Sequence, residues 1–100
     1  MTISIGDLGI DVGHRRVTFR DREIVLSPTE YRLLRELSEA PGVVHTHQML
    51  LRAVWGDTHS DEAEYLHVYM GRLRRKIEPD PANPSYFRTL HGIGYMLNEP

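Results

Sequence analysis

Apolar positions alternate with polar or small ones along the first 26 residues of the chain. Alternation with a period of two is typical of strands that bury one face. Residues that favour turns interrupt the alternation at Gly6-Asp7, Gly13-His14 and Asp21-Arg22. The pattern therefore predicts a four-stranded antiparallel meander over residues 1–26.

A helix is predicted directly after this sheet. Ser27 can act as its N-cap, Pro28 suits its first position, and Glu30 can return a hydrogen bond that completes a capping box. Its apolar stripe consists of Tyr31, Leu33, Leu34 and Leu37. The helix is expected to end at Ala40-Pro41-Gly42, because proline and glycine stop helices.

A second, shorter helix is predicted after the extended pair Val43-Val44. Thr46 is its expected N-cap and Gly56 its end. Its apolar residues are Leu50, Leu51, Val54 and Trp55. Trp55 is interpreted as a core residue rather than as a platform for a ligand. The next segment, residues 57–61, is by default a solvated loop.

A third helix, predicted over residues 61–78, carries an apolar stripe and a cationic face on opposite sides. The stripe consists of Leu66, Met70, Leu73 and Ile77, which recur at helical spacing. The opposite face carries Glu64, Val68, Gly71, Arg72 and Arg75, with Tyr65, His67 and Lys76 on its flanks. From the helix alone, this face is either a solvated surface or a surface that binds nucleic acid.

The final segment predicts a β-hairpin. Pro79, Pro81 and Pro84 end the third helix, and strands are expected at about 86–90 and 94–98. The strands turn through residues 91–94, where either Gly92 or Gly94 can adopt a positive φ.

The order of four strands, three helices and a hairpin predicts the α+β fold class and a winged helix-turn-helix. Residues 1–100 are expected to form one domain. Its parts are the sheet in 1–26, the three-helix core in 27–78 and the wing in 86–98.

Charge is distributed unevenly along a chain that is slightly acidic overall. The net charge is -2 and the pI about 6.3, so no overall cationic field draws the chain towards phosphates. Residues 1–65 contain seven Lys or Arg and eleven Asp or Glu, whereas residues 66–100 contain five and three. The cationic excess therefore coincides with the third helix and the hairpin.

The sequence contains no cysteine, which excludes disulfides, thiolate catalysis and cysteine-based zinc sites. No apolar run approaches the roughly 18 residues of a membrane span, and the amino terminus lacks a signal-peptide pattern. A cytoplasmic protein without membrane contact is expected.

Neither catalysis nor metal binding is indicated. His45, His47, His59 and His67 do not have the spacing of a closed tetrahedral ligand set. No Ser/His/Asp or paired-carboxylate arrangement stands at a useful spacing. From the sequence we expect a protein that is not an enzyme and that binds neither a cofactor nor a metal.

Several short motifs occur in the order and spacing of one bacterial family. They are residues 26–34 (LSPTEYRLL) at the first helix, 48–50 (QML) and 54–56 (VWG) at the second, 73–77 (LRRKI) in the third and 92–95 (GIGY) at the hairpin. Over nearly its whole length the chain resembles the carboxy-terminal effector domain of OmpR/PhoB-type response regulators, the winged-helix transcription factors of bacterial two-component phosphorelay systems. Residues 65–70 with 78–81 are most similar to the KdpE branch, which controls a potassium-transport operon.

The resemblance implies sequence-specific binding of double-stranded DNA, with the third helix in the major groove. The implied base contacts are Arg72, Val68, Tyr65 and Glu64. The implied phosphate contacts are Arg74, Arg75, Lys76, Thr89 and Tyr95, and His91 at the wing tip would approach the minor groove. By resemblance, the loop of Asp57, Thr58, His59 and Ser60 lies where a member of this family can contact RNA polymerase.

Some of these roles have alternatives. His91 stands where many relatives carry arginine, and a histidine is mostly uncharged near pH 7. Glu64 could accept a hydrogen bond from cytosine or repel a phosphate. Tyr69 could lie at the edge of the core or contact DNA. The whole domain could also be a winged-helix module for protein contact, with its cationic helix on an acidic partner.

By resemblance, the full-length protein would carry a receiver domain that a sensor kinase phosphorylates. Phosphorylation would pair two molecules on directly repeated half-sites of DNA, where they would recruit or position RNA polymerase. The 100 residues alone would be a monomer that binds more weakly.

Overall fold

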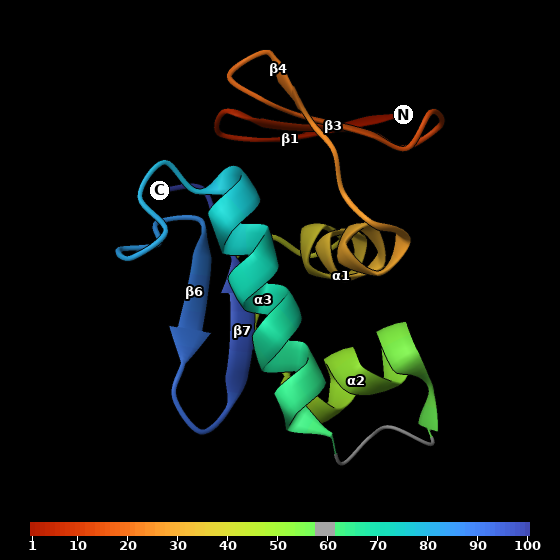
Figure 1. Cartoon of the computed structure of the whole chain (residues 1–100), viewed down its shortest axis with the longest axis vertical. Helices are drawn as coiled ribbons and strands as arrows, with labels where there is room; N and C mark the ends of the chain where they lie inside the picture. Colours follow the sequence, from red (N-terminus) through yellow and green to blue (C-terminus); the bar gives the residue numbers. More distant parts are fainter. Residues whose placement is uncertain (58–61) are drawn as a thin grey trace.

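In the computed structural model of the chain, which describes residues 1–57 and 62–100, an antiparallel sheet covers one end of a three-helix unit (Figure 1). Its strands are β1 (Thr2–Ile5), β2 (Leu8–Asp11), β3 (Arg16–Phe19) and β4 (Arg22–Ile24), paired in the order β1-β2-β3-β4. This is the predicted meander.

Because apolar and polar residues alternate along these strands, the apolar side chains lie on one face of the sheet, which packs against the rest of the molecule. Cross-strand pairs such as Leu8 with Phe19 and Ile10 with Val17 bury one face. Tyr86, far along the chain, receives that face. Its ring lies 5.2 Å from the ring of Phe19, edge to face, and its hydroxyl accepts the Asp7 N–H at 2.9 Å.

Three helices follow, α1 (Pro28–Ser38), α2 (His47–Trp55) and α3 (Ala63–Ile77). The capping box of α1 forms as predicted: the Glu30 N–H donates to Ser27 Oγ at 3.2 Å and the Ser27 N–H donates to Glu30 Oε1 at 2.8 Å. Thr46 caps α2 through the Met49 N–H, at 3.1 Å. The helix α3 ends where Glu78 turns to extended backbone, as expected for a residue before proline.

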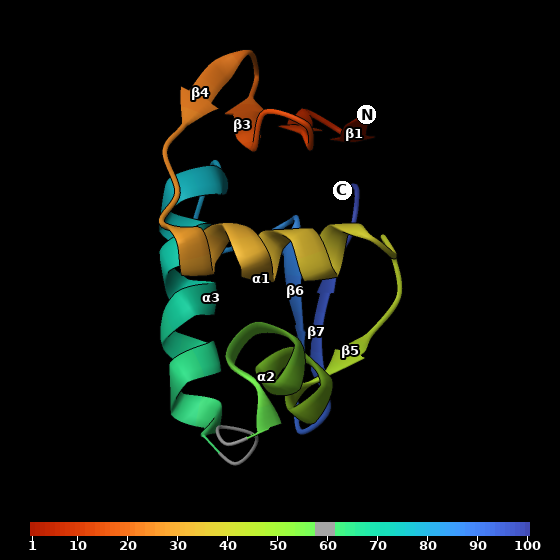
Figure 2. The ribbon, with the colours of Figure 1, turned by 90° about the vertical axis from the view of Figure 1, so that its right-hand side faces the viewer.

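The predicted apolar stripes meet in one core between the helices and both sheets. The stripe of α3 is almost fully buried against α1 and α2, and Figure 2 shows these two helices on one side of α3. The buried apolar side chains of the three helices are Tyr31, Leu33, Leu34, Leu37, Leu50, Leu51, Val54, Leu66, Met70, Leu73 and Ile77. Among the described residues, no helix is long and apolar enough to cross a membrane.

The carboxy-terminal hairpin is part of a second sheet with a strand that the sequence did not predict. Strands β6 (Phe87–Leu90) and β7 (Gly94–Leu97) form the hairpin, and β5 (His45–Thr46) pairs with β7, in the order β5-β7-β6. Gly92 adopts the positive φ of the turn, 77°. Gly94 has a different reason to be glycine, because a Cβ there would collide with the His45 carbonyl.

Candidate nucleic-acid interface

One face of α3 is turned away from the core and carries the residues that the sequence predicts to contact bases, together with Arg75. Tyr65 and Val68 are each 44% exposed, and Glu64, Arg72 and Arg75 are exposed too. This face is the consequence of helical rotation, since the buried stripe uses the other side of the same helix. It offers two guanidinium groups and two large apolar surfaces to a partner.

Gly71 lies next to Arg72 and one turn before Arg75 on this helix. A Cβ at this position would meet only the Arg75 guanidinium, at 3.4 Å or beyond. Packing inside the protein therefore does not require glycine there. The missing side chain leaves room for an approaching backbone or sugar, at a cost of about 1 kcal/mol in helix stability relative to alanine.

Arg74, also predicted to contact phosphate, lies between α3 and the hairpin. Its Nε and Nη2 donate to the Phe87 carbonyl at 3.2 and 2.7 Å, and Nη2 also donates to Thr89 Oγ1 at 2.7 Å. Its guanidinium lies 5.7 Å from the ring centre of Tyr95. Burial lowers the pKa of Arg74, while the neighbouring Tyr95 and Glu78 act in the opposite direction.

Glu78, which the sequence did not single out, completes this junction. Its carboxylate accepts the N–H groups of Ser85, Tyr86 and Phe87 at 2.8 to 3.1 Å. Because β6 is an edge strand, the outward polar groups of Phe87 need partners. The Glu78 carboxylate accepts the Phe87 N–H, and Arg74 donates to the Phe87 carbonyl. The end of α3 therefore holds the base of the wing in place.

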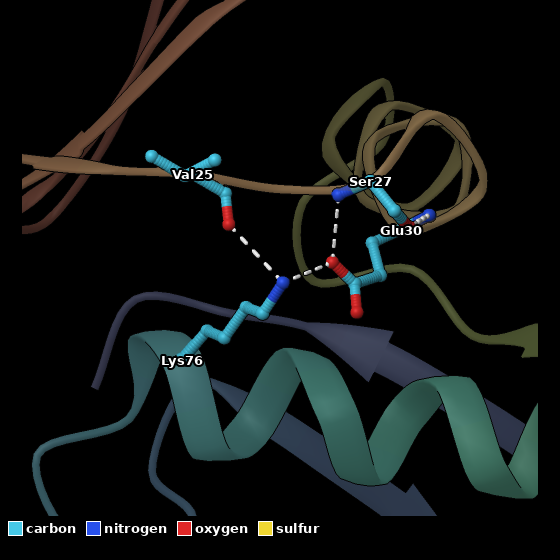
Figure 3. A network of polar contacts seen from close by, with 4 residues as sticks. All are labelled: Val25, Ser27, Glu30 and Lys76. Carbon is cyan, nitrogen blue, oxygen red and sulfur yellow. Dashed lines mark hydrogen bonds and ion pairs between the residues drawn. The ribbon is translucent and has the colours of Figure 1, made fainter.

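Lys76 connects α3 to the start of α1 (Figure 3). Its Nζ lies 2.6 Å from Glu30 Oε1 and donates to the Val25 carbonyl at 3.1 Å. The Glu30 side chain is 3% exposed and that of Lys76 39%. Burial alone would raise the pKa of Glu30, but hydrogen bonds from Lys76 and Ser27 outweigh it, so the pKa lies below its ordinary value.

The wing tip is exposed at the same end of the molecule as the start of α3, opposite the β1–β4 sheet (Figures 1 and 2). His91, Gly92 and Ile93 form this tip and are all exposed. Thr89, on β6, is exposed as well, whereas Tyr95 is 5% exposed and burial raises the pKa of its phenol. On the wing, His91 is therefore exposed to a partner, whereas only a small part of the Tyr95 side chain reaches the surface.

A surface hollow of about 600 Å³ brings several of the predicted contacts together between α3, α2 and the wing. Its lining consists of His47, Glu62, Ala63, Glu64, Tyr65, His67 and Tyr95. Three predicted contacts, Glu64, Tyr65 and Tyr95, thus share one concave surface. The rings of His47 and Tyr95 meet edge to face at 5.5 Å, which joins the start of α2 to the wing.

Of the loop assigned to RNA polymerase, only Asp57 lies within the described residues; Thr58, His59 and Ser60 lie outside them. Asp57 is strongly exposed, and its carboxylate lies 3.7 Å from the Arg52 guanidinium. An ion pair of this length between exposed side chains contributes little to stability.

Comparison with known proteins identifies the family. A family profile described as "Transcriptional regulatory protein, C terminal" matches residues 21–97. The chain belongs to this family, the OmpR/PhoB-type effector domains. The match includes all three helices and the wing, and the predicted family and winged-helix fold are confirmed.

Curated relatives of this OmpR/PhoB-type domain include a DNA-binding response regulator and a transcriptional regulatory protein. The chain is 41% identical over 98 residues to MtrA of Mycolicibacterium smegmatis, with 98% of the chain and 43% of MtrA covered. It is also 41% identical over 95 residues to the KDP operon regulator KdpE of Escherichia coli, with 95% of the chain and 42% of KdpE covered. The chain thus spans less than half the length of these relatives.

Solved structures of the family have the same fold. The Klebsiella pneumoniae RstA DNA-binding domain, determined in complex with the RstA box, superposes with a TM-score of 0.90 at 28% identity, covering 99% of this chain and 98% of that one. The Thermotoga maritima OmpR/PhoB homologue DrrB superposes with a TM-score of 0.88 at 33% identity, covering 97% and 44%.

Proposed function

We propose that this effector domain binds duplex DNA in a sequence-specific manner through the exposed face of α3 and thereby regulates transcription. The observation that carries the proposal is the geometry of α3. Its apolar stripe is buried while Tyr65, Val68, Arg72 and Arg75 are exposed. The exposed wing tip at the same end would meet the neighbouring groove.

Base recognition is assigned to Arg72, Val68, Tyr65 and Glu64. The guanidinium of Arg72 can form two hydrogen bonds with the O6 and N7 edge of guanine, and Val68 can contact a thymine methyl. Glu64 can accept from the amino group of cytosine. Of these four residues, Arg72 alone is an exposed side chain with paired donors, so it is the leading base contact.

Phosphate contacts are assigned first to Arg75, with His91 near the minor groove. Thr89 and Tyr95 are assigned weaker phosphate contacts, because the Thr89 hydroxyl already accepts from Arg74 and Tyr95 is only 5% exposed. The sequence predicts the same phosphate role for Arg74 and Lys76. Their nitrogen atoms already donate to Phe87, Glu30 and Val25. We therefore assign these two residues a smaller share of the electrostatic attraction to DNA.

The longer protein is proposed to be a cytoplasmic response regulator with a receiver domain and a cognate sensor kinase. The support is the length of the relatives, of which the chain covers 43% and 42%. Pairing of two phosphorylated molecules on direct repeats, contact of Asp57 to Ser60 with RNA polymerase, and control of a potassium-transport operon belong to the same proposal. Control of a potassium-transport operon is supported by the 41% identity to KdpE. The chain is equally similar to MtrA, at 41% identity.

Selection of bound sequences from a random duplex pool, followed by titrations with the selected site, tests this function. Binding should weaken steeply with salt because phosphate contacts release counterions. Arg72→Ala should lose about 1 to 3 kcal/mol of binding free energy and relax the preference at one base pair. Arg32→Ala, an exposed arginine on α1, serves as the control.

A pool without enrichment, together with an unchanged Arg72→Ala variant, would contradict DNA recognition. The remaining function would then be protein contact, with the cationic face of α3 on an acidic partner.

A further inference from the structure

Four side chains from two helices form a continuous row beside the exposed face of α3. The guanidinium of Arg72 lies over the ring of Tyr69, 4.7 Å from its centre. Tyr69 meets the ring of Trp55 edge to face at 5.4 Å, and Trp55 stacks on Tyr65 at 6.2 Å. Arg72 is thus the exposed end of an arginine–tyrosine–tryptophan contact.

The inner part of this row is well fixed. Trp55 and Tyr69 are partly buried and pack against the hydrophobic core. Trp55 is the last residue of α2, whereas Tyr69 and Arg72 are one turn apart on α3. The ring that Arg72 contacts is therefore held from a second helix.

A fixed Tyr69 ring restricts the orientations of the Arg72 side chain. An exposed arginine samples many rotamers, and ordering it on a base edge costs conformational entropy. A cation within about 6 Å of an aromatic centre is attracted by the ring, so part of that ordering exists before DNA arrives. Preorganisation of this kind favours the interaction that needs a defined direction, namely the paired hydrogen bonds to a base.

We propose that Tyr69 is a specificity-determining positioning residue, whose ring holds the Arg72 guanidinium in the orientation from which it recognises a base pair. The inference rests on the proposed function, because it presupposes that Arg72 recognises a base. It assigns Tyr69 a role that is neither a direct DNA contact nor core packing alone. The role of Trp55 follows from it, since Trp55 keeps the Tyr69 ring in place.

The experiment is a double-mutant cycle in the full 100-residue chain, using the duplex that the wild type selects and a variant of that duplex changed at the base pair where Arg72→Ala loses preference. Tyr69→Leu should reduce the preference for this base pair about threefold. In the Arg72→Ala background the same substitution should change nothing. Tyr69→Phe keeps the ring and should retain the preference.

The outcomes separate this inference from the proposed function. A wild type without sequence preference refutes both. If the wild type is sequence-specific but Tyr69→Leu keeps the preference for this base pair or binds more tightly, the inference alone is overturned. The same holds if Tyr69→Leu loses as much preference in the Arg72→Ala background as in the wild type. The slope of affinity against salt should stay the same in Tyr69→Leu, because no phosphate contact is removed.

A measurement on the wild type keeps the inference testable even if Tyr69→Leu does not fold. In the free protein, NMR should show a ring-current shift and restricted motion at the Arg72 Nε–H group. The exposed Arg75 provides the internal comparison. Equal mobility of the two side chains, without a ring-current shift at Arg72, would refute the positioning role.

Discussion

Two pairs of cations on the last two turns of α3 have different surroundings. Arg72 and Arg75 are exposed on the outward face. Arg74 donates to the Phe87 carbonyl and Lys76 to the Glu30 carboxylate and Val25 carbonyl. The difference shows that two of these four cations are already engaged by acceptors within the protein, so a count of charges along the helix does not describe its outward face.

The physical cause is the rotation of about 100° per residue in a helix. Arg72 and Arg75 are three residues apart and share one face, whereas Arg74 points towards the wing and Lys76 towards α1. Each inner cation meets an acceptor that needs a partner, an outward carbonyl of an edge strand or a buried carboxylate. The inner pair therefore contributes to folding, whereas the outer pair stays exposed on the outward face, where the proposed function uses it.

The largest expected effect is at Arg74. Arg74→Met should lower the free energy of unfolding by about 2 to 3 kcal/mol, because charge-assisted hydrogen bonds to Phe87 and Thr89 are lost. Arg88→Met, an exposed position on β6, should change it by less than about 0.5 kcal/mol. Urea unfolding followed by circular dichroism measures both, and equal effects at the two positions would remove the distinction between inner and exposed cations.

Lys76 should have a smaller effect on stability, and one that depends on pH. Lys76→Met should cost about 2 kcal/mol near neutral pH, because Glu30 stays buried without its cation, while solvent at the half-exposed lysine limits the loss. Since the pKa of Glu30 is lowered in the folded protein, this stabilisation is present above its ordinary value of about 4.5 and is lost as the pH falls further.

The measurement is the difference in unfolding free energy between wild type and Lys76→Met from pH 7 downwards, with Arg75→Met as the control. For Lys76→Met the difference should shrink as acid protonates Glu30, which happens at a higher pH in the variant than in the wild type because Lys76 no longer lowers the pKa of Glu30. For Arg75→Met it should stay close to zero throughout. A constant difference across the whole range would mean that the Glu30 carboxylate is not what Lys76 stabilises.

The smallest expected effect is at the wing tip. His91→Arg adds a permanent cation at an exposed position and should tighten binding to the selected duplex about threefold at moderate salt. Ser4→Arg adds the same charge on β1, at the other end of the molecule, and should leave affinity nearly unchanged. If both substitutions tighten binding equally, the gain reflects net charge and not a wing that approaches DNA.

Much of the fold could be predicted because its signals are local. The capping box joins Ser27 and Glu30, three positions apart, and the buried stripe of α3 recurs within a single helix. The exposed face, with Arg72 and Arg75, follows from the same periodicity. Local spacing thus determined which side chains point outward.

The contacts of the inner cations could not be predicted in this way. Lys76 and Glu30 are 46 positions apart, and Arg74 and Phe87 are 13 apart. Strand β5 has only two residues and exists because Gly94, distant in sequence, lets β7 approach. Periodicity identifies the faces of an element, but not the element that each face meets.

The salt dependence of DNA binding tests the central claim most directly, namely that the exposed cations of α3 meet DNA and the inner ones hold the fold. The affinity for the selected duplex would be titrated at several salt concentrations for wild type, Arg75→Met and Lys76→Met, under conditions where all three are folded. Arg75→Met should reduce the slope of log affinity against log salt by about 0.9, the value for one lost phosphate contact, and Lys76→Met should reduce it by clearly less. An equal reduction in both variants would contradict the account.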